Sequence, residues 1–348
     1  MKIGLKIVQQ VCIRRPDDWH VHFRDGALLA YTVPATAVNF ARALVMPNLE
    51  KPLTTLEVIL AYQTRIINAA KNYPNFKPYF TFYLNETISP DVFSAAKAYP
   101  FILGGKLYPA GVTTHSKAGT RDIDALYPIF EVMQTNQLVL QIHGEEITGD
   151  IFEREALFLT MHLKKIIKNF PKLRIVLEHI STEAAVQCVE NAPNTVAATI
   201  TAHHLRYDRN QLLAGGIRPH YYCLPILKHA RDKKALQLAA TSGNPKFFAG
   251  TDSAPHGIAQ KECASGCAGI YTAPFSLSMY AEVFETMGAL KQLDAFLGQY
   301  GADFYQLPLT SECVTLVREP IQVPDFFDFK SIHVVPVHAG GTFAWSLR

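Results

Sequence analysis

The sequence predicts an α/β fold, a (β/α)8 TIM barrel with a short C-terminal extension. Short apolar runs of strand character alternate with longer segments of helical period over most of the 348 residues. Eight such strand and helix units are typical of a parallel barrel. A doubly wound open sheet would share this alternation, but no G-x-G-x-x-G motif follows an early strand, so the nucleotide-binding form of that fold lacks its signature.

The elements follow one another along the chain in a regular order. The expected strands are the latter part of 11–22, then 43–47, 79–84, 101–107, 138–143, 174–179, 195–201 and 246–250. The expected helices are 54–71, 122–134, 152–169, 182–191 and 231–241, with Thr54, Asp122 and Ser181 as helix N-caps. Residues 276–298 also have helical character. We expect a single domain over residues 1–348, with the barrel at about 11–300 and a proline-rich, β-like packing tail at about 309–348.

Composition limits the partners. Lys and Arg number 33 against 30 Asp and Glu, a net charge of +3, and the basic residues are scattered, which argues against nucleic acid and favours a small-molecule ligand. No apolar run approaches the roughly 20 residues that span a bilayer, and residues 1–15 lack the order of a secretory signal. The six cysteines contain no C-x2-C pair, so we expect reduced thiols, a cytoplasmic location and no membrane partner.

Polar residues with metal-binding chemistry fall at the ends of the expected strands. Alternate residues of a strand share a face, so His20, His22 and Arg24 are expected to point into one cavity. Further polar residues end or follow later strands: Asn48, Lys106, His143, His179 and Asp252. The carboxyl ends of parallel barrel strands form one rim, so we expect these side chains to meet at one site.

Imidazoles and carboxylates at such a rim suit zinc and related divalent ions, which a metal hydrolase uses to ionise water. Lys106 has two readings. It could be a surface lysine that extends its amine into solvent, or a buried amine whose lowered pKa allows it to capture carbon dioxide as a carbamate between two metals. Asn48 could equally be a turn residue after Pro47.

Seven segments resemble one known family. Residues 15–26, Arg-Pro-Asp-Asp-Trp-His-Val-His-Phe-Arg-Asp-Gly, look like the signature of the dihydroorotase family of the amidohydrolase superfamily, in its single-domain bacterial form. The other segments agree in order and approximate spacing: 45–48, 105–109, 141–145, 177–182, 218–227 and 250–256. The resemblance covers about residues 14–308, and the segment Gly-Thr-Asp-Ser-Ala-Pro-His at 250–256 is its most specific part.

The resemblance implies a binuclear zinc site and a reaction. One zinc would be held by His20, His22 and Asp252 and the other by His143 and His179, with carboxylated Lys106 (N6-carboxylysine) as the bridge. The implied reaction is the reversible cyclisation of N-carbamoyl-L-aspartate to L-dihydroorotate plus water, a step of pyrimidine (UMP) biosynthesis. Asp252 would act as base and then acid.

The resemblance also assigns substrate contacts. Arg24, Asn48 and His256 would bind the substrate carboxylate, and backbone groups of Leu224 and Ala268 would hold the ring, with His22 and His143 also facing the substrate. The glycine-bearing loop 109–119 would close as a lid through Thr113 and Thr114. A homodimer is implied as well.

One departure and two alternatives accompany this assignment. At 201–205 the sequence reads Thr-Ala-His-His-Leu where the family has Pro and Gln before a single His, so we interpret His203 as a local replacement and not as an additional ligand. A hydantoinase-like enzyme would share the metals but not Arg24, Asn48 and His256. A catalytically silent scaffold would be expected to lack metal ligands, all of which are present here.

Overall fold

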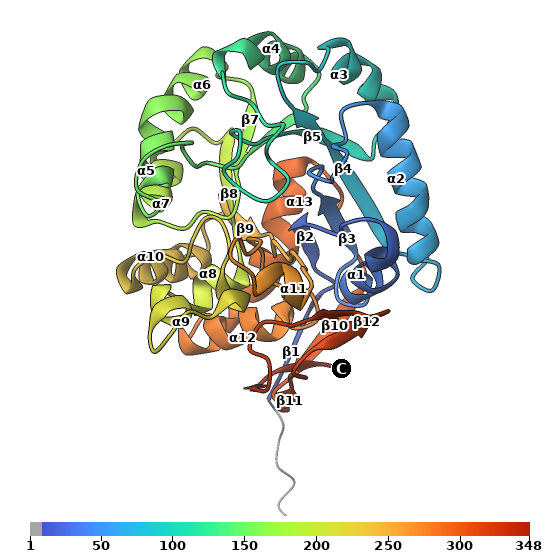
Figure 1. Ribbon diagram of the computed structural model, residues 1–348, viewed down its shortest axis with the longest axis vertical. Helices are drawn as coiled ribbons and strands as arrows, with labels where there is room; N and C mark the ends of the chain where they lie inside the picture. Colours follow the sequence, from blue (N-terminus) through green and yellow to red (C-terminus); the bar gives the residue numbers. More distant parts are fainter. Residues whose placement is uncertain (1–8) are drawn as a thin grey trace, which may run out of the picture.

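The computed structural model describes residues 9–348 and contains an eight-stranded parallel sheet (Figure 1). Its strands, in sheet order, are β2 (Asp17–Val21), β3 (Arg42–Val45), β4 (Lys77–Leu84), β5 (Ile102–Leu107), β6 (Val139–Ile142), β7 (Arg174–Leu177), β8 (Val196–Ile200) and β9 (Phe247–Ala249). A parallel bridge between Val21 and Ser253 brings the chain after β9 back to β2, so the barrel is nearly closed. The predicted barrel is confirmed.

Alternation along the strands sorts apolar side chains between the inside and the outside of the barrel. Leu44, Val139 and Val176 belong to one buried cluster that also contains Trp19 and Tyr305, whose rings stack with centroids 4.5 Å apart. Their strand neighbours, such as Val45 and Leu140, belong to the larger cluster shared with the helices. The inside of the barrel is therefore a packed core, and the polar side chains gather at one end of it.

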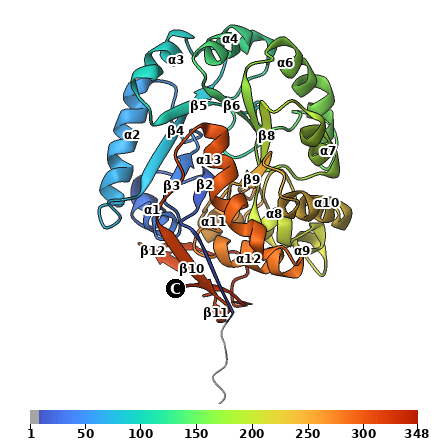
Figure 2. The ribbon, with the colours of Figure 1, turned by 180° about the vertical axis from the view of Figure 1, so that it is seen from behind.

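The helices surround the sheet, as Figures 1 and 2 show. The expected ones correspond to α2 (Leu56–Ala69), α4 (Tyr127–Thr135), α7 (Glu183–Asn191), α10 (Ala230–Thr241) and the continuous run α5 (Arg154–Phe158), π-helix Leu159–Leu163 and α6 (Lys164–Asn169). Five short helices were not expected: α1 (Leu29–Ala37), α3 (Asp91–Ala95), α8 (Ala202–Arg206), α9 (Arg209–Leu213) and α11 (Ile258–Lys261). Residues 276–298 contain α12 (Ser276–Thr286), and α13 (Tyr300–Tyr305) follows.

The predicted N-caps were wrong at the residue level. The side chains that accept hydrogen bonds from the first turns of α2 and α7 are Thr55 and Thr182, each one residue beyond the predicted cap. Asp122 accepts from the backbone N–H of Asp124, one position before the N-cap of a short 3-10 helix that precedes α4. At α2 and α7 two adjacent polar residues could cap the helix, and sequence does not decide between them.

The first barrel strand, expected in the latter part of 11–22, is β2, and the residues before it form a separate strand in another sheet. β1 (Gln10–Arg14) pairs antiparallel with β10 (Cys313–Val317), which pairs with β15 (Ser346–Leu347). The remaining tail strands form two small ribbons, β11 (Ile321–Gln322) with β14 (Thr342–Phe343) and β12 (Phe327–Phe329) with β13 (Ile332–Val334). The tail is thus β-rich, as expected, and it lies beside α1 and α12 (Figure 2).

Two sequence expectations concern what the chain lacks. Over residues 9–348, no helix is long and apolar enough to cross a membrane. The expectation that residues 1–15 carry no secretory signal falls partly on residues 1–8, which lie outside the described residues. The six cysteines, all within the described range, are free thiols.

Candidate active site

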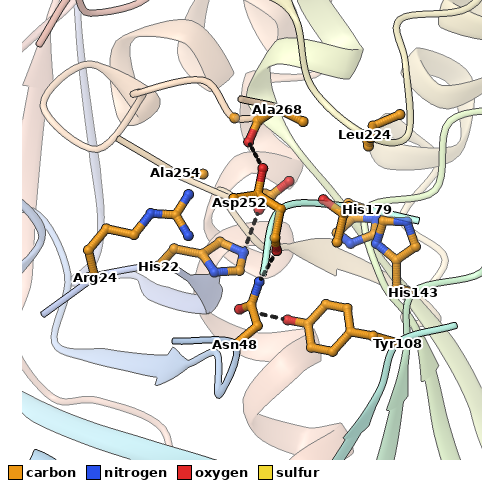
Figure 3. Close-up of a pocket in the computed structure, with 13 residues that line it drawn as sticks. His22, Arg24, Asn48, Tyr108, His143, His179, Leu224, Asp252, Ala254 and Ala268 are labelled. Atoms are coloured by element: carbon orange, nitrogen blue, oxygen red, sulfur yellow. Dashed lines mark hydrogen bonds and ion pairs between the residues drawn. The ribbon is translucent and has the colours of Figure 1, made fainter. Parts of the chain in front are cut away.

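A pocket of about 330 Å³ lies at the carboxyl ends of the barrel strands (Figure 3). Its lining combines imidazoles, a carboxylate, a guanidinium and backbone groups: His22, Arg24, Asn48, Tyr108, Thr113, Thr114, His143, His179, Leu224, Asp252, Ala254, Ala268 and Gly269. Residues from eight separate parts of the sequence meet there, because the carboxyl ends of the strands share one rim.

His20, His22 and Asp252 form a compact group of buried side chains that could hold a metal ion. His20 lies on β2 and His22 one residue beyond it, with their Nε2 atoms 3.3 Å apart. Oδ1 of Asp252 is 3.0 Å from Nε2 of His22 and 3.5 Å from Nε2 of His20. Three ligand atoms therefore point at one position, the arrangement expected of a metal-binding group.

His143 and His179 lie on the other side of the pocket. Their ring centroids are 4.7 Å apart, and that of His179 is 4.9 Å from His20. Burial lowers the pKa of both rings, with the positive charge of Lys106 a further cause, and Nδ1 of His179 has no hydrogen-bond partner in the described part of the chain. Neutral imidazole is the form that binds metal ions.

Lys106 is the penultimate residue of β5 and is fully buried. Its Nζ has no hydrogen-bond partner among residues 9–348 and lies 4.8 Å from the ring centroid of Tyr108. Burial lowers the pKa of this amine to about 8, although the negative charges of Glu178 and Asp252 oppose the shift. The alternative of a surface lysine is therefore wrong, because the side chain does not reach solvent.

Asp252 differs from Lys106 in the effect that dominates its pKa. Burial alone would raise the pKa of this carboxyl group, but the hydrogen bond with His22 and the nearby imidazoles outweigh it and hold the pKa below its ordinary value. Burial also lowers the pKa of His22, to about 3. The site thus holds an ionised carboxylate against neutral imidazoles at neutral pH.

Three residues that line the pocket have a strained backbone. Arg24, His179 and Asp252 have φ angles of 61°, 41° and 47°, in the left-handed region that residues other than glycine rarely adopt. Each side chain is buried at the pocket. Strain of this kind is typical of functional sites, where the surrounding structure fixes an otherwise unfavourable conformation.

Arg24 reaches the pocket by a route different from the one predicted. Strand β2 ends at Val21, so strand alternation explains His20 and His22 but not Arg24, which lies in the following loop. Its Nη2 is 2.7 Å from Nε2 of His256, and that nitrogen is 3.1 Å from the carbonyl oxygen of Ala268. Figure 3 shows Arg24 on the side of the pocket opposite His143 and His179.

The loop 109–119 closes over the pocket through a chain of hydrogen bonds. Tyr108 Oη donates to Asn48 Oδ1 at 3.0 Å, and Asn48 Nδ2 donates to the Thr114 carbonyl at 3.0 Å. Thr114 Oγ1 in turn donates to the Ala268 carbonyl at 3.1 Å, and Thr113 lines the pocket beside it. Asn48 is therefore not merely a turn residue, since its amide joins two sides of the site.

Two buried glutamates support the imidazoles, and sequence reasoning assigned a role to neither. Glu178 Oε2 lies 2.9 Å from His20 Nδ1 and accepts a hydrogen bond from Thr199 Oγ1 at 2.6 Å. Glu145 Oε2 lies 2.7 Å from His143 Nε2. A signal was present, since each glutamate lies within two residues of a predicted ligand in segments 141–145 and 177–182. Tyr108 was also missed.

A second group of possible ligands, His203, His204 and Cys223, lies in the described structure. Both ring nitrogens of His204 are already engaged, Nδ1 with Thr201 Oγ1 at 2.8 Å and Nε2 with the Pro225 carbonyl at 3.0 Å. The Cys223 thiol contacts that same carbonyl at 3.2 Å. This geometry does not favour a further metal site.

The barrel and its rim of histidines, lysine and aspartate define a metal-dependent hydrolase of the amidohydrolase family, whose profile matches residues 13–312. The chain is 51% identical to the dihydroorotase of Teredinibacter turnerae over 98% of its own length and 100% of that protein. It therefore belongs to the dihydroorotase family, hydrolases that act on cyclic amides, and the resemblance seen in the sequence is confirmed.

Solved structures agree with this assignment. The dihydroorotase of Saccharomyces cerevisiae, in complex with 5-fluoroorotic acid, superposes with a TM-score of 0.91 at 37% identity, covering 98% of this chain and 99% of that one. The L-hydantoinase of Arthrobacter aurescens has a TM-score of 0.80 at 17% identity, covering 97% and 83%, which shows a shared fold alone. The hydantoinase-like alternative is therefore the less supported one.

Proposed function

We propose that this protein is a zinc-dependent dihydroorotase that interconverts N-carbamoyl-L-aspartate and L-dihydroorotate plus water in pyrimidine biosynthesis. The observation that carries the proposal is the position of Lys106. This buried amine lacks a hydrogen-bond partner within the described residues. It also lies close enough to Asp252, His143 and His179 for their charges to interact with its own. A small substrate with a carboxylate and a cyclic amide fits the chemistry of the pocket.

The donor set suits two zinc ions. His20, His22 and Asp252 would hold one and His143 and His179 the other, with carboxylated Lys106 between them. Support comes from four of the buried polar atoms that lack a hydrogen-bond partner in residues 9–348: Lys106 Nζ, His179 Nδ1 and one oxygen each of Glu145 and Glu178. Buried polar groups are normally satisfied, so a cluster of such atoms around imidazoles is a reason to expect ligands there.

Carboxylation of Lys106 requires a neutral amine. With its pKa lowered from 10.5 to about 8, about a tenth of the side chain is uncharged at pH 7, far more than for an ordinary lysine. The nitrogen lone pair of Lys106 forms a bond to the carbon of carbon dioxide and a proton is released, which gives an anionic carbamate. This converts a buried cation into an anion beside the imidazoles, and the anion supplies oxygen ligands.

Bound zinc would ionise water near neutral pH and polarise the amide carbonyl of the substrate. In ring opening, Asp252 accepts the proton of the attacking water and delivers it to the departing ring nitrogen, so one carboxylate serves as base and then as acid. The pKa of Asp252 lies below its ordinary value, so the carboxylate is ionised at neutral pH before it takes part. His22 and His143 face the substrate beside it.

The remaining polar groups bind the substrate. Arg24 would pair with the free carboxylate through two parallel hydrogen bonds, helped by Asn48 and His256. Backbone groups of Leu224 and Ala268 would hold the ring, and closure of the loop with Thr113 and Thr114 would exclude water. Arg24 lies within hydrogen-bond distance of His256, and Asn48 donates a hydrogen bond to the loop 109–119. The proposed carboxylate-binding side chains are therefore already held in place by neighbouring groups.

We further propose that the protein acts as a homodimer in the cytoplasm. The dimer rests on the resemblance to the family, and the location on the charge balance and the free thiols.

Two ring-opening assays test the function. The zinc-loaded protein should hydrolyse L-dihydroorotate and leave hydantoin essentially unchanged, because hydantoin lacks the carboxylate that Arg24 would bind. 5-Fluoroorotic acid, the ligand of the yeast dihydroorotase structure, should compete with dihydroorotate. Faster turnover of hydantoin would point to the hydantoinase-like alternative, and turnover of neither compound to the scaffold alternative.

A further inference from the structure

Lys261 is a buried lysine whose ammonium group is fully satisfied by main-chain carbonyls. It is the last residue of α11 and only 3% exposed. Its Nζ donates to the carbonyl oxygens of Tyr222, Cys267 and Gly269, each at 2.8 Å. An ammonium group has three N–H donors, so every donor of Lys261 is used to hold backbone.

The three carbonyls belong to two chain segments that line the active-site pocket. One segment leads from Tyr222 to Leu224, and the other contains Ala268. The backbone N–H of Gly269 donates to the Tyr222 carbonyl at 3.0 Å, so the segments also contact each other directly. Lys261 therefore joins the two parts of the backbone that would hold the substrate ring.

The orientation of the Ala268 peptide follows from this arrangement. The carbonyls on either side of it, those of Cys267 and Gly269, both turn toward Lys261. The Ala268 carbonyl points the other way, toward the pocket, where it lies 3.1 Å from His256 Nε2 and 3.1 Å from Thr114 Oγ1 (Figure 3).

The backbone at Gly269 is closely packed against its surroundings. Gly269 has a φ of +148°, and a Cβ atom there would lie 2.6 Å from the Ala254 carbonyl oxygen. The segment thus packs against the loop that follows β9 on one side and accepts hydrogen bonds from Lys261 on the other. Loss of the hydrogen bonds from Lys261 would allow the Ala268 peptide to rotate.

We propose that Lys261 is a positioning residue for substrate binding, which fixes the Ala268 carbonyl toward the pocket by holding the carbonyls on both sides of it. This inference rests on the proposed function, because it assumes that the backbone at Ala268 contacts the substrate ring. Lys261 itself does not line the pocket, so it would act through the backbone and not on the reacting atoms.

The test compares Lys261→Met with a matched control, Lys246→Met. Lys246 also donates to three main-chain carbonyls, those of Val189, Glu190 and Ala192, but it precedes β9 at the opposite end of the barrel. Methionine keeps the length and apolar stem of lysine and removes the donors. The measurements are KM and kcat for dihydroorotate, the zinc content and the melting temperature.

For Lys261→Met we expect KM to rise by at least about tenfold with kcat within about threefold of wild type, since the ring contact is made in the ground state as well as the transition state. Zinc content should equal that of wild type. Lys261→Arg keeps a cationic donor and should recover part of the loss. Lys246→Met should lower the melting temperature and leave KM unchanged.

A KM within about twofold of wild type in Lys261→Met, whatever its melting temperature, would overturn the inference and leave Lys261 a stabilising residue only. If that variant does not fold, Lys261→Gln, which keeps an amide donor, carries the same comparison with the same threshold. Failure of the proposed function is seen separately, as a wild-type protein that does not turn over dihydroorotate.

Discussion

His20 Nδ1 lies 2.9 Å from Glu178 Oε2, and both side chains are fully buried. The other ring nitrogen of His20 points to His22 and Asp252. A carboxylate on the far nitrogen of a histidine fixes its ring orientation and tautomer and makes the near nitrogen a better metal ligand. Glu178 is therefore the residue that presents His20 to the proposed zinc site.

Glu178→Gln should weaken zinc binding by about 10- to 100-fold, because the His20 ring would then face a neutral amide in place of a charged carboxylate. The measurement is zinc retention during titration with a chelator. Glu285→Gln is the control, since Glu285, near the end of α12, pairs with Arg318 at 2.7 Å and does not line the pocket. Equal zinc retention by wild type and Glu178→Gln would remove this role.

Arg24→Lys should raise KM for dihydroorotate by about tenfold or more, because a single ammonium group cannot reproduce the two parallel hydrogen bonds of a guanidinium to a carboxylate. Arg65→Lys is a matched control. Arg65 makes such a paired contact with Asp25, at 3.0 and 2.8 Å, but on the exposed surface. If both variants show the wild-type KM, Arg24 does not bind the carboxylate.

Replacing both Thr113 and Thr114 by alanine should reduce turnover in both reaction directions, with the zinc content unchanged. The double variant removes the Thr114 hydroxyl that bonds to the Ala268 carbonyl and so weakens the closed loop. Steady-state assays with dihydroorotate and with N-carbamoyl-L-aspartate measure the effect. Thr64→Ala, on the exposed face of α2, serves as the control. Unchanged turnover of both substrates would refute the lid.

Glu155 provides a prediction about stability and pH. Burial raises its pKa from 4.5 to about 6, although Lys228 and the hydrogen bond from Thr182 oppose the shift. Between these pH values the folded state keeps a proton that the unfolded state has released, so this residue lowers stability as pH rises. A shift of this size corresponds to about 2 kcal/mol.

Chemical unfolding of wild type and Glu155→Gln at pH 4 to 7 measures this effect. Relative to the variant, the wild-type protein should lose about 2 kcal/mol of unfolding free energy across the range. A glutamine oxygen can still accept the hydrogen bonds from Ser181 and Thr182, so the difference isolates the ionisation. Parallel stability curves would contradict the raised pKa.

Most of the architecture was predictable from sequence because strand and helix periods are local properties. Residues 174–179 and 246–250, for example, are short apolar runs followed at once by polar residues, and they are β7 and β9 with their loops. The split of 11–22 was not predictable, since the pairing of β1 with β10 joins residues about three hundred positions apart. No local pattern reports such a contact.

The site residues also divide into those that the sequence could place and those that depend on contacts across the fold. His20, His22, His143, His179, Lys106 and Asp252 could be placed together because the carboxyl ends of parallel strands must converge. The sequence places Glu178 beside the predicted ligand His179 but does not show that it pairs with His20. Lys261 has no sequence signal, because its role depends on which carbonyls face it across the fold. The unusual φ of Arg24 likewise has no sequence signal, since arginine seldom adopts it.

The central claim is that Lys106, as a carbamate, joins two zinc ions in one catalytic site. Zinc analysis and dihydroorotate turnover on wild type and Lys106→Ala test it most directly, with circular dichroism to check folding. The account predicts about two zinc ions per wild-type subunit, and loss of most zinc together with at least about a thousandfold loss of turnover in the variant. A folded Lys106→Ala protein that keeps both its zinc and its activity would contradict it.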